Sequence, residues 1–480
     1  MSFMWEPCHD PGFASRASDP AQEELLVTTT AEPAAALTAA PAQSPVAGRR
    51  LSYALVLFLA IHIVLNIDRS ILSVAIEPIK REYGLKDAQL GLLSLGFAAF
   101  FAVAGLPLGR WVDKGARRVV LSLCVGFFSL MTAVAGATHS FTQLLITRFA
   151  VGAGEAGGGP AMLSMLSDLY PAHRRASAIS AYYVAVPIGF VLTFLVGSWV
   201  AQTFGWRHVF FLAGAPGLVL AAVAMLTLKE PVRGDAESHH VVAAAHWLGS
   251  LRFVLSQPAQ RHVLATTMIT SSLSAAVITW SMSFLIRSHG VPLARAGLIL
   301  AFAYGLIGAA GAAGGGWLAD RLSRRDIRWR AWTCAIAVAL ALPALALFLL
   351  SPSLVVACCG LAAWSMLTNS IFGPGIALSQ SLAPPRMRGA AASIFYLLSN
   401  LVGVGVGPLL IGLVSDRLRP AHGPDSLRFA LLYLSVIYLW AGLHFLFAGR
   451  TLRADLARIE PPSPVGAQQT KDGGQDNSII

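Results

Sequence analysis

The chain has 480 residues, of which 55% are hydrophobic and only 12% are charged. Soluble domains carry about 25% charged residues, so this composition excludes an ordinary soluble protein and favours an all-α membrane protein. The formal net charge is +11. This charge would suit a nucleic-acid partner, but the basic residues recur in alternate loops, as they do in membrane proteins. We therefore expect no nucleic-acid partner.

Signatures of enzymes and metal proteins are missing from the sequence. Of the five cysteines, four lie in apolar stretches and none has the spacing of a metal site. No phosphate-binding loop of the type used by ATP-driven proteins occurs. We expect no enzyme activity, no cofactor and no metal site.

Residues 1–49 are rich in Ala, Pro and Thr and contain no apolar run long enough to span a membrane. They lack the features of a signal peptide, so we expect a disordered cytoplasmic tail. Twelve apolar segments follow, and they should be helices because unpaired backbone groups are too costly in hydrocarbon. We place them near 51–76, 87–112, 117–138, 141–168, 175–201, 207–228, 260–287, 293–319, 329–350, 353–382, 388–415 and 427–449.

A longer connection separates the sixth and seventh segments, and part of it is mildly amphipathic, as in helices that lie on a membrane surface. The sequence therefore predicts two six-helix bundles related by pseudo-symmetry, in a protein that we expect to be a monomer. The predicted parts are a tail at 1–49, a bundle at 50–228, a cytoplasmic linker with a surface helix at 229–259, a bundle at 260–450 and a cytoplasmic tail at 451–480.

A charged motif occurs once in each half. In each copy a Gly precedes an Asp by four residues, a basic residue follows the Asp, and an Arg pair ends the loop. Such an internal repeat indicates two related halves. A carboxylate at a helix end can pair with these arginines or cap a neighbouring helix, so we interpret the motif as a cytoplasmic gate, with a static loop contact as the alternative. Its residues are Gly109, Asp113, Arg117, Arg118, Gly316, Asp320, Arg321 and Arg324.

The distribution of basic residues also predicts how the chain is oriented in the membrane. Lys and Arg are concentrated in the loops after even-numbered segments, and Arg417 and Arg419 are exceptions. The rule that basic loops stay inside places both termini in the cytoplasm, for a multi-pass protein of the inner or plasma membrane.

Few ionisable residues lie inside the apolar segments, where they are costly and usually functional. Asp68 and Arg69 lie in the first segment, and Arg148 and Glu155 lie in the fourth, where they share one face about 10 Å apart. The depths of the two pairs overlap, so we expect one cluster in which a carboxylate takes up a proton and an arginine changes partner. A purely structural ion-pair network is the alternative.

Several polar or aromatic residues are candidates for lining a central cavity, although core packing or lipid contact is the alternative for any one of them. They are His62, Asn66, Tyr183, Trp280, Phe284, Tyr304, Tyr396 and Asn400.

Residues 50–450 resemble the major facilitator superfamily. The repeated gate motif is similar to its loop signature, and Arg148-Phe-Ala-Val-Gly152-Ala-Gly154-Glu155 is similar to its signature in the fourth helix. Within the superfamily the chain most resembles the Spinster-like branch. The stretches that carry this resemblance include Asn66-Ile-Asp68-Arg69, Ser167-Asp168-Leu-Tyr-Pro171, Gly205-Trp206-Arg207, Lys229-Glu230-Pro231 and Asn400-Leu-Val-Gly403.

The resemblance implies a proton-coupled secondary transporter that moves lysolipid-like amphiphiles by alternating access, with protons, substrate and membrane lipids as partners. It also implies that Asp68, Arg69 and Glu155 form the protonation and substrate switch. Related motifs occur in organic-anion symporters of the same superfamily, so a proton-coupled carboxylate symporter that clamps its substrate with Arg69 and Arg148 remains an alternative. A sensor that binds without transporting is a third hypothesis. The loop signature has Ala116 and Ser323 where Gly is usual, which bears on the flexibility of the gate.

Overall fold

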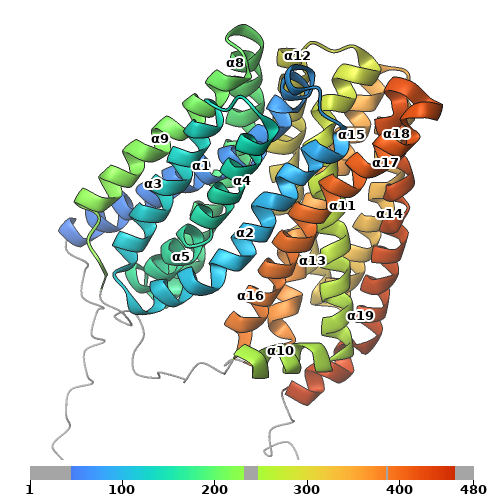
Figure 1. Cartoon of the computed structure of the whole chain (residues 1–480). Coiled ribbons are helices and arrows are strands. Elements are labelled where there is room, and N and C mark those ends of the chain that lie inside the picture. Colours follow the sequence, from blue (N-terminus) through green and yellow to red (C-terminus); the bar gives the residue numbers. More distant parts are fainter. Residues whose placement is uncertain (1–44, 232–246, 385–386, 460–480) are drawn as a thin grey trace, which may run out of the picture. The chain divides into compact units, whose positions relative to one another are not determined.

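The computed structural model of the protein describes residues 45–231, 247–384 and 387–459, and every regular element in these ranges is helical (Figure 1). The predicted all-α membrane class is therefore confirmed. Ten helical stretches of the described chain are long and apolar enough to cross a membrane, so the predicted number of twelve is not confirmed as such. The predicted tails lie outside the described residues, apart from 45–49 and 451–459, which are helical.

The first half of the chain contains the blue and green elements of Figure 1. They are α1 (Pro45–Tyr83), α2 (Asp87–Lys114), α3 (Arg117–Ala135), α4 (Phe141–Glu155), α5 (Gly158–Leu169), α6 (Ala172–Tyr183), α7 (Ala185–Val191), the π-helix η1 (Leu192–Gly197), α8 (Ser198–Thr203) and α9 (Trp206–Thr227).

The second half contains the yellow to red elements, including two further π-helices, η2 and η4, and the 3₁₀-helix η5. They are α10 (Trp247–Ser256), α11 (Pro258–His289), α12 (Leu293–Leu300), η2 (Ala301–Ile307), α13 (Gly308–Ser323), α14 (Trp329–Leu350), α15 (Leu354–Ser381), α16 (Arg388–Leu398), η4 (Ser399–Val406), α17 (Gly407–His422), η5 (Gly423–Asp425), α18 (Ser426–Ser435) and α19 (Ile437–Ile459).

Helix ends follow local sequence signals. The helix α11 begins with Pro258, whose missing N–H is not needed in a first turn, and it is followed by Gly290, which adopts the left-handed conformation with φ of 64°. The first turn of α11 also receives a cap from α19, because the Ala259 N–H donates to the Asp455 carboxylate at 2.8 Å. The sequence thus terminates this long helix at both ends.

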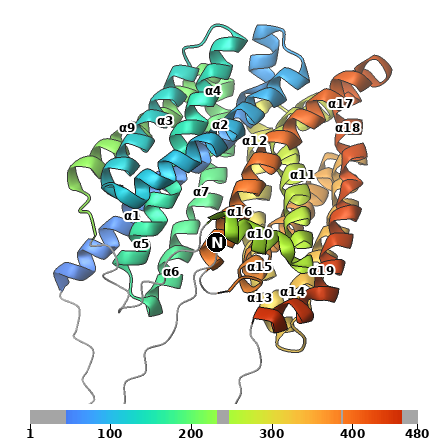
Figure 2. The same ribbon diagram turned by 60° about the horizontal axis from the view of Figure 1, so that its bottom comes forward.

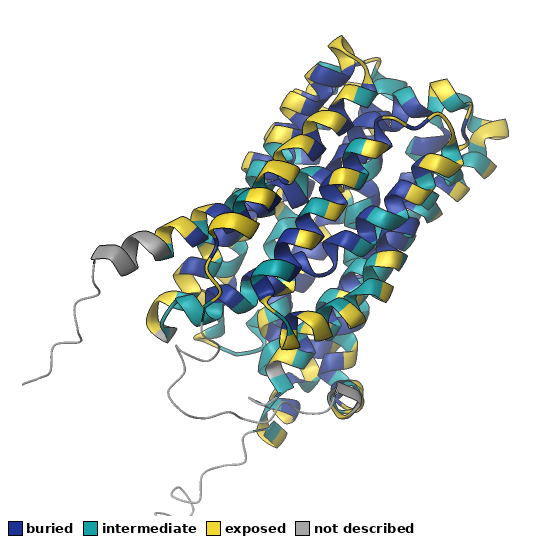
Figure 3. Ribbon diagram, turned by 60° about the vertical axis from the view of Figure 1, so that its left-hand side comes forward, coloured by how far each residue is buried: buried dark blue, intermediate teal, exposed yellow. Residues whose placement is uncertain are grey.

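Exposed residues, yellow in Figure 3, occur along the helices, and many of them have large apolar side chains. Leu226 is 81% exposed, and Val103 and Val355 are similarly exposed. Soluble monomers rarely expose contiguous apolar surface of this extent, whereas a bilayer covers it. The burial pattern therefore agrees with the composition in placing these helices in a membrane.

The two halves meet along two sets of helices. The helix α2 packs against η4 and α17, and α7, η1 and α8 pack against η2 and α12. Glycines permit this approach: a Cβ on Gly91 of α2 would lie only 2.6 Å from the Cα of Leu409, and a Cβ on Gly405 only 2.9 Å from that of Ala98. The three π-helices lie in this interface, where such wide turns often mark functional sites.

We call the end of the molecule where α1 ends and α2 begins the bridging end; Gly91 and Leu409 meet near it. At the opposite end, the gate-motif end, α2 ends at Lys114 and α13 ends at Ser323. A Cβ added to Gly109 or Gly316 there would meet no atom within 4 Å. Figure 2 turns this end forward and shows α5 and α6 on one side and α13 and α14 on the other.

Glycine packing inside the first half is testable at Gly152. A Cβ there would collide with the main-chain carbonyl of Phe97 on α2. We expect Gly152→Ala to cost about 1–3 kcal/mol through overpacking and to lower the melting temperature of the purified protein in a fluorescence-based unfolding assay. Gly314→Ala is the control, because nothing lies within 4 Å of a Cβ there; equal melting temperatures of the two variants would contradict the packing argument.

Candidate functional site

The first predicted pair is formed by Arg69 on α1 and Glu155 on α4. The Arg69 Nε donates to Glu155 Oε2 at 2.7 Å, and the Glu155 side chain is fully buried. The Arg69 side chain is 38% exposed, and its guanidinium lies over the ring of Phe101 with 5.4 Å to the centroid. The Glu155 carboxylate is thus buried in the protein, while the Arg69 side chain remains partly exposed.

The second pair joins Asp68 on α1 to Arg148 on α4. Their nearest atoms, Asp68 Oδ2 and Arg148 Nη1, are 3.6 Å apart, and both side chains are almost completely buried. Asp68 Oδ1 also accepts a hydrogen bond from the Thr132 hydroxyl of α3, and Arg148 lies over the ring of Phe210. The structure therefore brings together the four residues that the sequence predicted to cluster, and it arranges them as two pairs.

Hydrogen bonding in this cluster is incomplete. Within the described residues, Glu155 Oε1 and two nitrogen atoms of Arg148 are buried without a hydrogen-bond partner. A buried polar group that lacks a partner typically costs about 1–3 kcal/mol. Asp68 also acts electrostatically on Glu155, so two carboxyl groups share this region. The arrangement has capacity for one more proton and for a different pairing of the arginines.

The regular helix is interrupted directly after Glu155. The helix α4 ends at this residue and α5 begins at Gly158, so the apolar segment predicted at 141–168 is interrupted in its middle. Gly157 lies in the break, where a Cβ would be 2.7 Å from the Cys124 sulfur of α3. The buried carboxylate therefore lies at the end of a helix rather than within one.

An aromatic group lies between the charged cluster and the second half. The His62 ring stacks on Tyr182 with 4.1 Å between centroids, and His62 Nδ1 is 3.1 Å from the Tyr182 carbonyl oxygen. The neighbouring Tyr183 hydroxyl is 3.0 Å from the Tyr396 hydroxyl. This hydrogen bond joins α6 of the first half to α16 of the second.

The other predicted cavity residues divide into two sets. The Asn66 and Asn400 side chains are partly exposed, and each donates to the carbonyl one turn earlier, at 2.7 Å and 2.8 Å. Trp280, Phe284 and Tyr304 are packed in the core: Trp280 donates to the Pro408 carbonyl, Phe284 contacts the Phe348 ring, and the Tyr304 hydroxyl bonds to Ser281.

In the gate motif, Arg117 is buried and holds two acidic partners. Its guanidinium pairs with Asp168 and, at 2.9 Å, with Glu230. Glu230 also accepts the main-chain N–H groups of Arg117 and Arg118, and so caps the start of α3. Sequence reasoning missed Asp168 and Glu230 as partners, although both lie in the stretches that carry the family resemblance.

The two motif aspartates are placed differently from these arginines. Asp113 and Asp320 are exposed, and among the described residues neither side chain has a hydrogen bond or ion pair in the structure. Arg321 lies over the ring of Trp317, and Arg324 is exposed. The structure does not bring Asp113 and Arg117 together as a pair, and the gate role of the motif stays a prediction.

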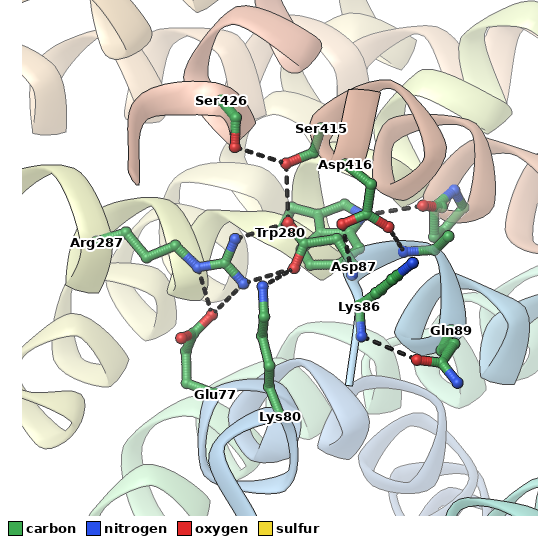
Figure 4. A network of polar contacts seen from close by, with 12 residues as sticks. Glu77, Lys80, Lys86, Asp87, Gln89, Trp280, Arg287, Ser415, Asp416 and Ser426 are labelled. Atoms are coloured by element: carbon green, nitrogen blue, oxygen red, sulfur yellow. Dashed lines mark hydrogen bonds and ion pairs between the residues drawn. The ribbon is translucent and has the colours of Figure 1, made fainter. Parts of the chain in front are cut away.

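A network that the sequence did not predict closes the bridging end (Figure 4). Arg287 of α11 pairs with Glu77 of α1 at 2.7 Å and with Asp87 of α2 at 2.9 Å, and Lys80 also pairs with Asp87. The Asp87 side chain is nearly fully buried. Charged residues at the ends of apolar segments resemble ordinary loop residues in a sequence, and only the packing of the two halves shows that these meet.

Asp416 of α17 adds a second bridge at the same place. Its carboxylate accepts the main-chain N–H groups of Asp87 at 3.0 Å and of Ala88 at 2.8 Å, as Figure 4 shows. The neighbouring Ser415 hydroxyl donates to the Asp87 carboxylate at 2.8 Å. The first turn of α2 is therefore capped by a side chain from the other half of the chain.

The Glu230 cap predicts a pH-dependent stability. Partial burial alone raises the pKa of Glu230, but hydrogen bonds from Arg118 and Arg117 outweigh it and hold the pKa below its ordinary value. A depressed pKa stabilises the fold above the unfolded value of about 4.3, and this contribution is lost as the pH falls through the folded pKa. We expect Glu230→Gln to lower the melting temperature at pH 7, with a smaller difference from the unsubstituted protein in acid.

Asp113→Asn is the matched control for this measurement, because it removes an exposed carboxylate at the same end. We expect it to leave the melting temperature unchanged at both pH values. A loss in Glu230→Gln that is independent of pH would contradict the electrostatic explanation.

Comparisons with known proteins agree with this geometry. Residues 58–408 match the family model described as Major Facilitator Superfamily. The chain is 33% identical over 415 residues to an MFS-type efflux pump of Mycolicibacterium smegmatis, covering 85% of this chain and 95% of that protein. It is 27% identical over 444 residues to protein spinster homolog 1 of Homo sapiens, covering 83% and 81%.

A solved structure is also similar. It is that of a bacterial homolog of the human lysosomal transporter Spinster in an inward-facing, unoccupied conformation, with a TM-score of 0.75, 28% identity and coverage of 86% of this chain and 99% of that one. An all-helical fold, ten membrane-length apolar helices and relatives of this kind lead to one conclusion. The chain belongs to the major facilitator superfamily, within its Spinster-like branch, and is a multi-pass membrane transporter for a small-molecule substrate rather than an enzyme.

Proposed function

We propose that this protein is a secondary active transporter that couples the movement of a lysolipid-like amphiphile to that of a proton. The observation that carries the proposal is the pair of Arg69 and Glu155. The carboxylate is fully buried with one oxygen lacking a hydrogen-bond partner, while the arginine is partly exposed. A carboxylate in this position is suited to exchange a proton, and the exchange changes how strongly it holds Arg69.

The coupling step follows from charge balance. A proton on Glu155 removes the negative charge that holds Arg69, and the guanidinium then offers its donors to an anionic group of the substrate. Without that proton, Glu155 competes with the substrate for the same arginine. Proton and anionic substrate therefore favour one another's binding at this site. Asp68 and Arg148 act beside this pair as a second carboxylate and a second cation that can take new partners.

The bridging network and the gate-motif aspartates support an alternating-access cycle. In this conformation the halves are joined at the bridging end by Arg287, while Asp113 and Asp320 at the other end are exposed and make no ion pair among the described residues. We assign the gate-motif end to the cytoplasm, together with both termini, in an inner or plasma membrane. The conformation is then inward-facing, and Asp113 and Asp320 would form ion pairs when the gate-motif end closes.

The proposal also includes the predicted helix count. The broken pair α4 and α5 forms one crossing, and the continuous stretch Gly389–Ile459 forms two, which gives twelve crossings in two halves at 50–228 and 260–450. The helix α10 lies within the predicted linker at 229–259 and packs against α11 and α16. A monomer is sufficient for this cycle, because both halves come from one chain.

A small organic anion is the second candidate substrate, because Arg69, whose side chain is partly exposed, would hold a carboxylate as well as a phosphate. The two candidates differ because an amphiphile carries an apolar tail that the transporter must also accommodate, whereas a small anion does not. Transport of a lysophospholipid and of a small dicarboxylate, assayed side by side in the same proteoliposomes, separates the two.

The first test replaces the buried carboxylate. We expect Glu155→Gln to abolish the pH dependence of transport in proteoliposomes, because the amide cannot take up a proton. Glu82→Gln is the control: Glu82 is also ion-paired, with Arg207, but lies outside the cluster. Loss of pH dependence in both variants, or retention in Glu155→Gln, would contradict the assignment.

The second test releases the bridging network. Asp87→Asn leaves Arg287 and Lys80 without the charge that both share, so we expect the bridging end to open and the gate-motif end to close. In a background without native cysteines, spin labels at His139 and Ser353 measure the distance across the bridging end. Labels at His173 and Arg325 measure the distance across the gate-motif end. Electron-electron distance measurements should then show longer distances for the first label pair and shorter distances for the second.

Asp425→Asn is the matched control for the distance measurements, because Asp425 lies at the same end but bonds within its own half, to Ser288 and Arg428. It should leave both distance distributions unchanged. Unchanged distances in Asp87→Asn would show that the network does not hold the end closed.

A further inference from the structure

An open pocket at the bridging end carries more positive charge than its own wall neutralises. It has a volume of about 650 Å³, which is within the usual range of small-molecule sites, and it shares several residues with the network of Figure 4. Five of its eleven lining residues are basic and one is acidic. The basic residues are Lys80, Arg81, Lys86, Arg287 and Arg419, and the acidic residue is Glu77. A concave surface with this balance of charge attracts anions.

Two of the five cations are already paired with carboxylates. Arg287 pairs with Glu77 and Asp87, and Lys80 pairs with Asp87. The side chains of Arg287 and Lys80 are each only 13% exposed. These two cations therefore belong to the bridging network and leave little charge for a ligand.

The other three cations are available to a ligand. Arg81, Lys86 and Arg419 are exposed, and none of their side chains makes an ion pair in the part of the chain that the structure describes. Glu82 follows Arg81 in the chain but pairs with an arginine of α9, and the Asp416 carboxylate accepts main-chain N–H groups. Neither of these carboxylates lines the pocket. Three positive charges thus face one open volume.

The three available cations come from both halves of the chain. Arg81 lies in the last turn of α1 and Lys86 directly precedes α2, whereas Arg419 lies in the last turn of α17. Arg419 is also one of the two arginines that depart from the loop pattern of basic residues in the sequence. The other, Arg417, is two residues earlier, which places it about 200° away around the helix, and it does not line the pocket. The departure at Arg419 therefore has a counterpart in the structure, at a place where the two halves meet.

We propose that this pocket binds a phosphate group, either of a free phosphate or of a lipid head group, and that the bound group holds the two halves together at the bridging end. A phosphate monoester carries about two negative charges at neutral pH and presents acceptor oxygens only, which matches three cations that can only donate. Each guanidinium can hold two phosphate oxygens at once, and the Lys86 ammonium adds a point charge.

The position of the pocket gives the bound group an effect on conformation. A phosphate that contacts Arg81 and Arg419 together has both partners only while the two halves are joined at this end. It therefore binds the joined state more tightly than the separated one and shifts the equilibrium toward the joined state. The site uses no residue of the cluster around Arg69 and Glu155, so it goes beyond the proposed coupling and needs no particular transported substrate.

The test is a thermal-unfolding titration of the purified full-length protein with sodium phosphate at pH 7.5, with sodium chloride added to keep the ionic strength constant. We expect the melting temperature to rise as the site fills, because a ligand that binds only the folded state stabilises it by mass action. Phosphate also stabilises proteins generally, since it is excluded from their surfaces, but that effect should be the same in all variants.

Two substitutions each remove one of the cations, from different halves. We expect Arg81→Gln and Arg419→Gln each to raise the phosphate concentration that gives half of the stabilisation about tenfold, through the loss of a charge-assisted contact. Arg417→Gln is the matched control, because it removes the same charge from an exposed position on the same helix outside the pocket. It should leave that concentration unchanged.

A second arm identifies the source of the phosphate group. The titration is repeated in lipid nanodiscs that contain either phosphatidic acid, whose head group is a phosphate monoester, or an equal amount of phosphatidylglycerol. A weaker response to free phosphate with phosphatidic acid than with phosphatidylglycerol supports the site and assigns it to a lipid head group. Equal responses that keep the dependence on Arg419 support the site and assign it to a soluble phosphate.

Equal half-maximal concentrations in the unsubstituted protein, Arg81→Gln and Arg419→Gln would overturn the site. A change in only one of the two variants would overturn the claim that the phosphate joins the halves, and an equal change in Arg417→Gln would reduce the effect to general surface charge. None of these outcomes depends on proton coupling. If Glu155→Gln keeps pH-dependent transport while the phosphate response is present, the proposed coupling fails and the phosphate site stands.

Discussion

Arg287 holds two carboxylates of the opposite half beside an open pocket of about 650 Å³, and we propose that the conformation of the molecule depends on that contact. Removing one partner from a buried ion pair costs far more than the pair itself contributes, because the remaining charge is left without compensation. Loss of Asp87 or Glu77 from the network would therefore leave Arg287 with a charge that is only partly compensated. The close contact of Gly91 on α2 with Leu409 on α17 lies at the same end.

Two of the charge clusters in the described residues, the bridging network and the first-half cluster, differ in how completely their polar groups are hydrogen-bonded. At the bridging end, Asp87 has Lys80, Arg287 and Ser415 as partners. In the first-half cluster, Glu155 and Arg148 keep polar atoms with no hydrogen-bond partner in the described residues. This difference agrees with the holding role that we propose for the network around Asp87 and with the switching role that we propose for the cluster around Glu155.

The class of fold and the charged cluster of the first half could be predicted from the sequence, for physical reasons. Apolar segments must be helices in hydrocarbon, so the class of fold followed directly. The convergence of Asp68, Arg69, Arg148 and Glu155 followed from helical periodicity and from the opposite directions of two segments. The separation of these residues into two pairs did not follow, because it depends on side-chain rotamers and on Thr132 of a third helix.

The features that could not be predicted from the sequence depend on contacts between the two halves of the chain. Asp87 and Arg287 lie in different halves, and nothing in their local sequence indicates that they meet. Trp280 and Phe284 were candidates for a cavity, but both are in the core, and an aromatic residue in an apolar segment has the same pattern in either place.

The cap that Asp416 provides for α2 has a consequence for the kinetics of the cycle. When the halves separate at this end, the N–H groups of Asp87 and Ala88 lose their acceptors and the first turn of α2 is left exposed. Uncapped first turns fray, so opening in the proposed cycle would include the loosening of one helical turn as well as the separation of two surfaces. Reclosure would re-form these hydrogen bonds at the end of a helix that is already present. Part of the barrier in that cycle would thus be a local folding step at one helix end, whose capping residue, Asp416, lies more than three hundred residues away in the sequence.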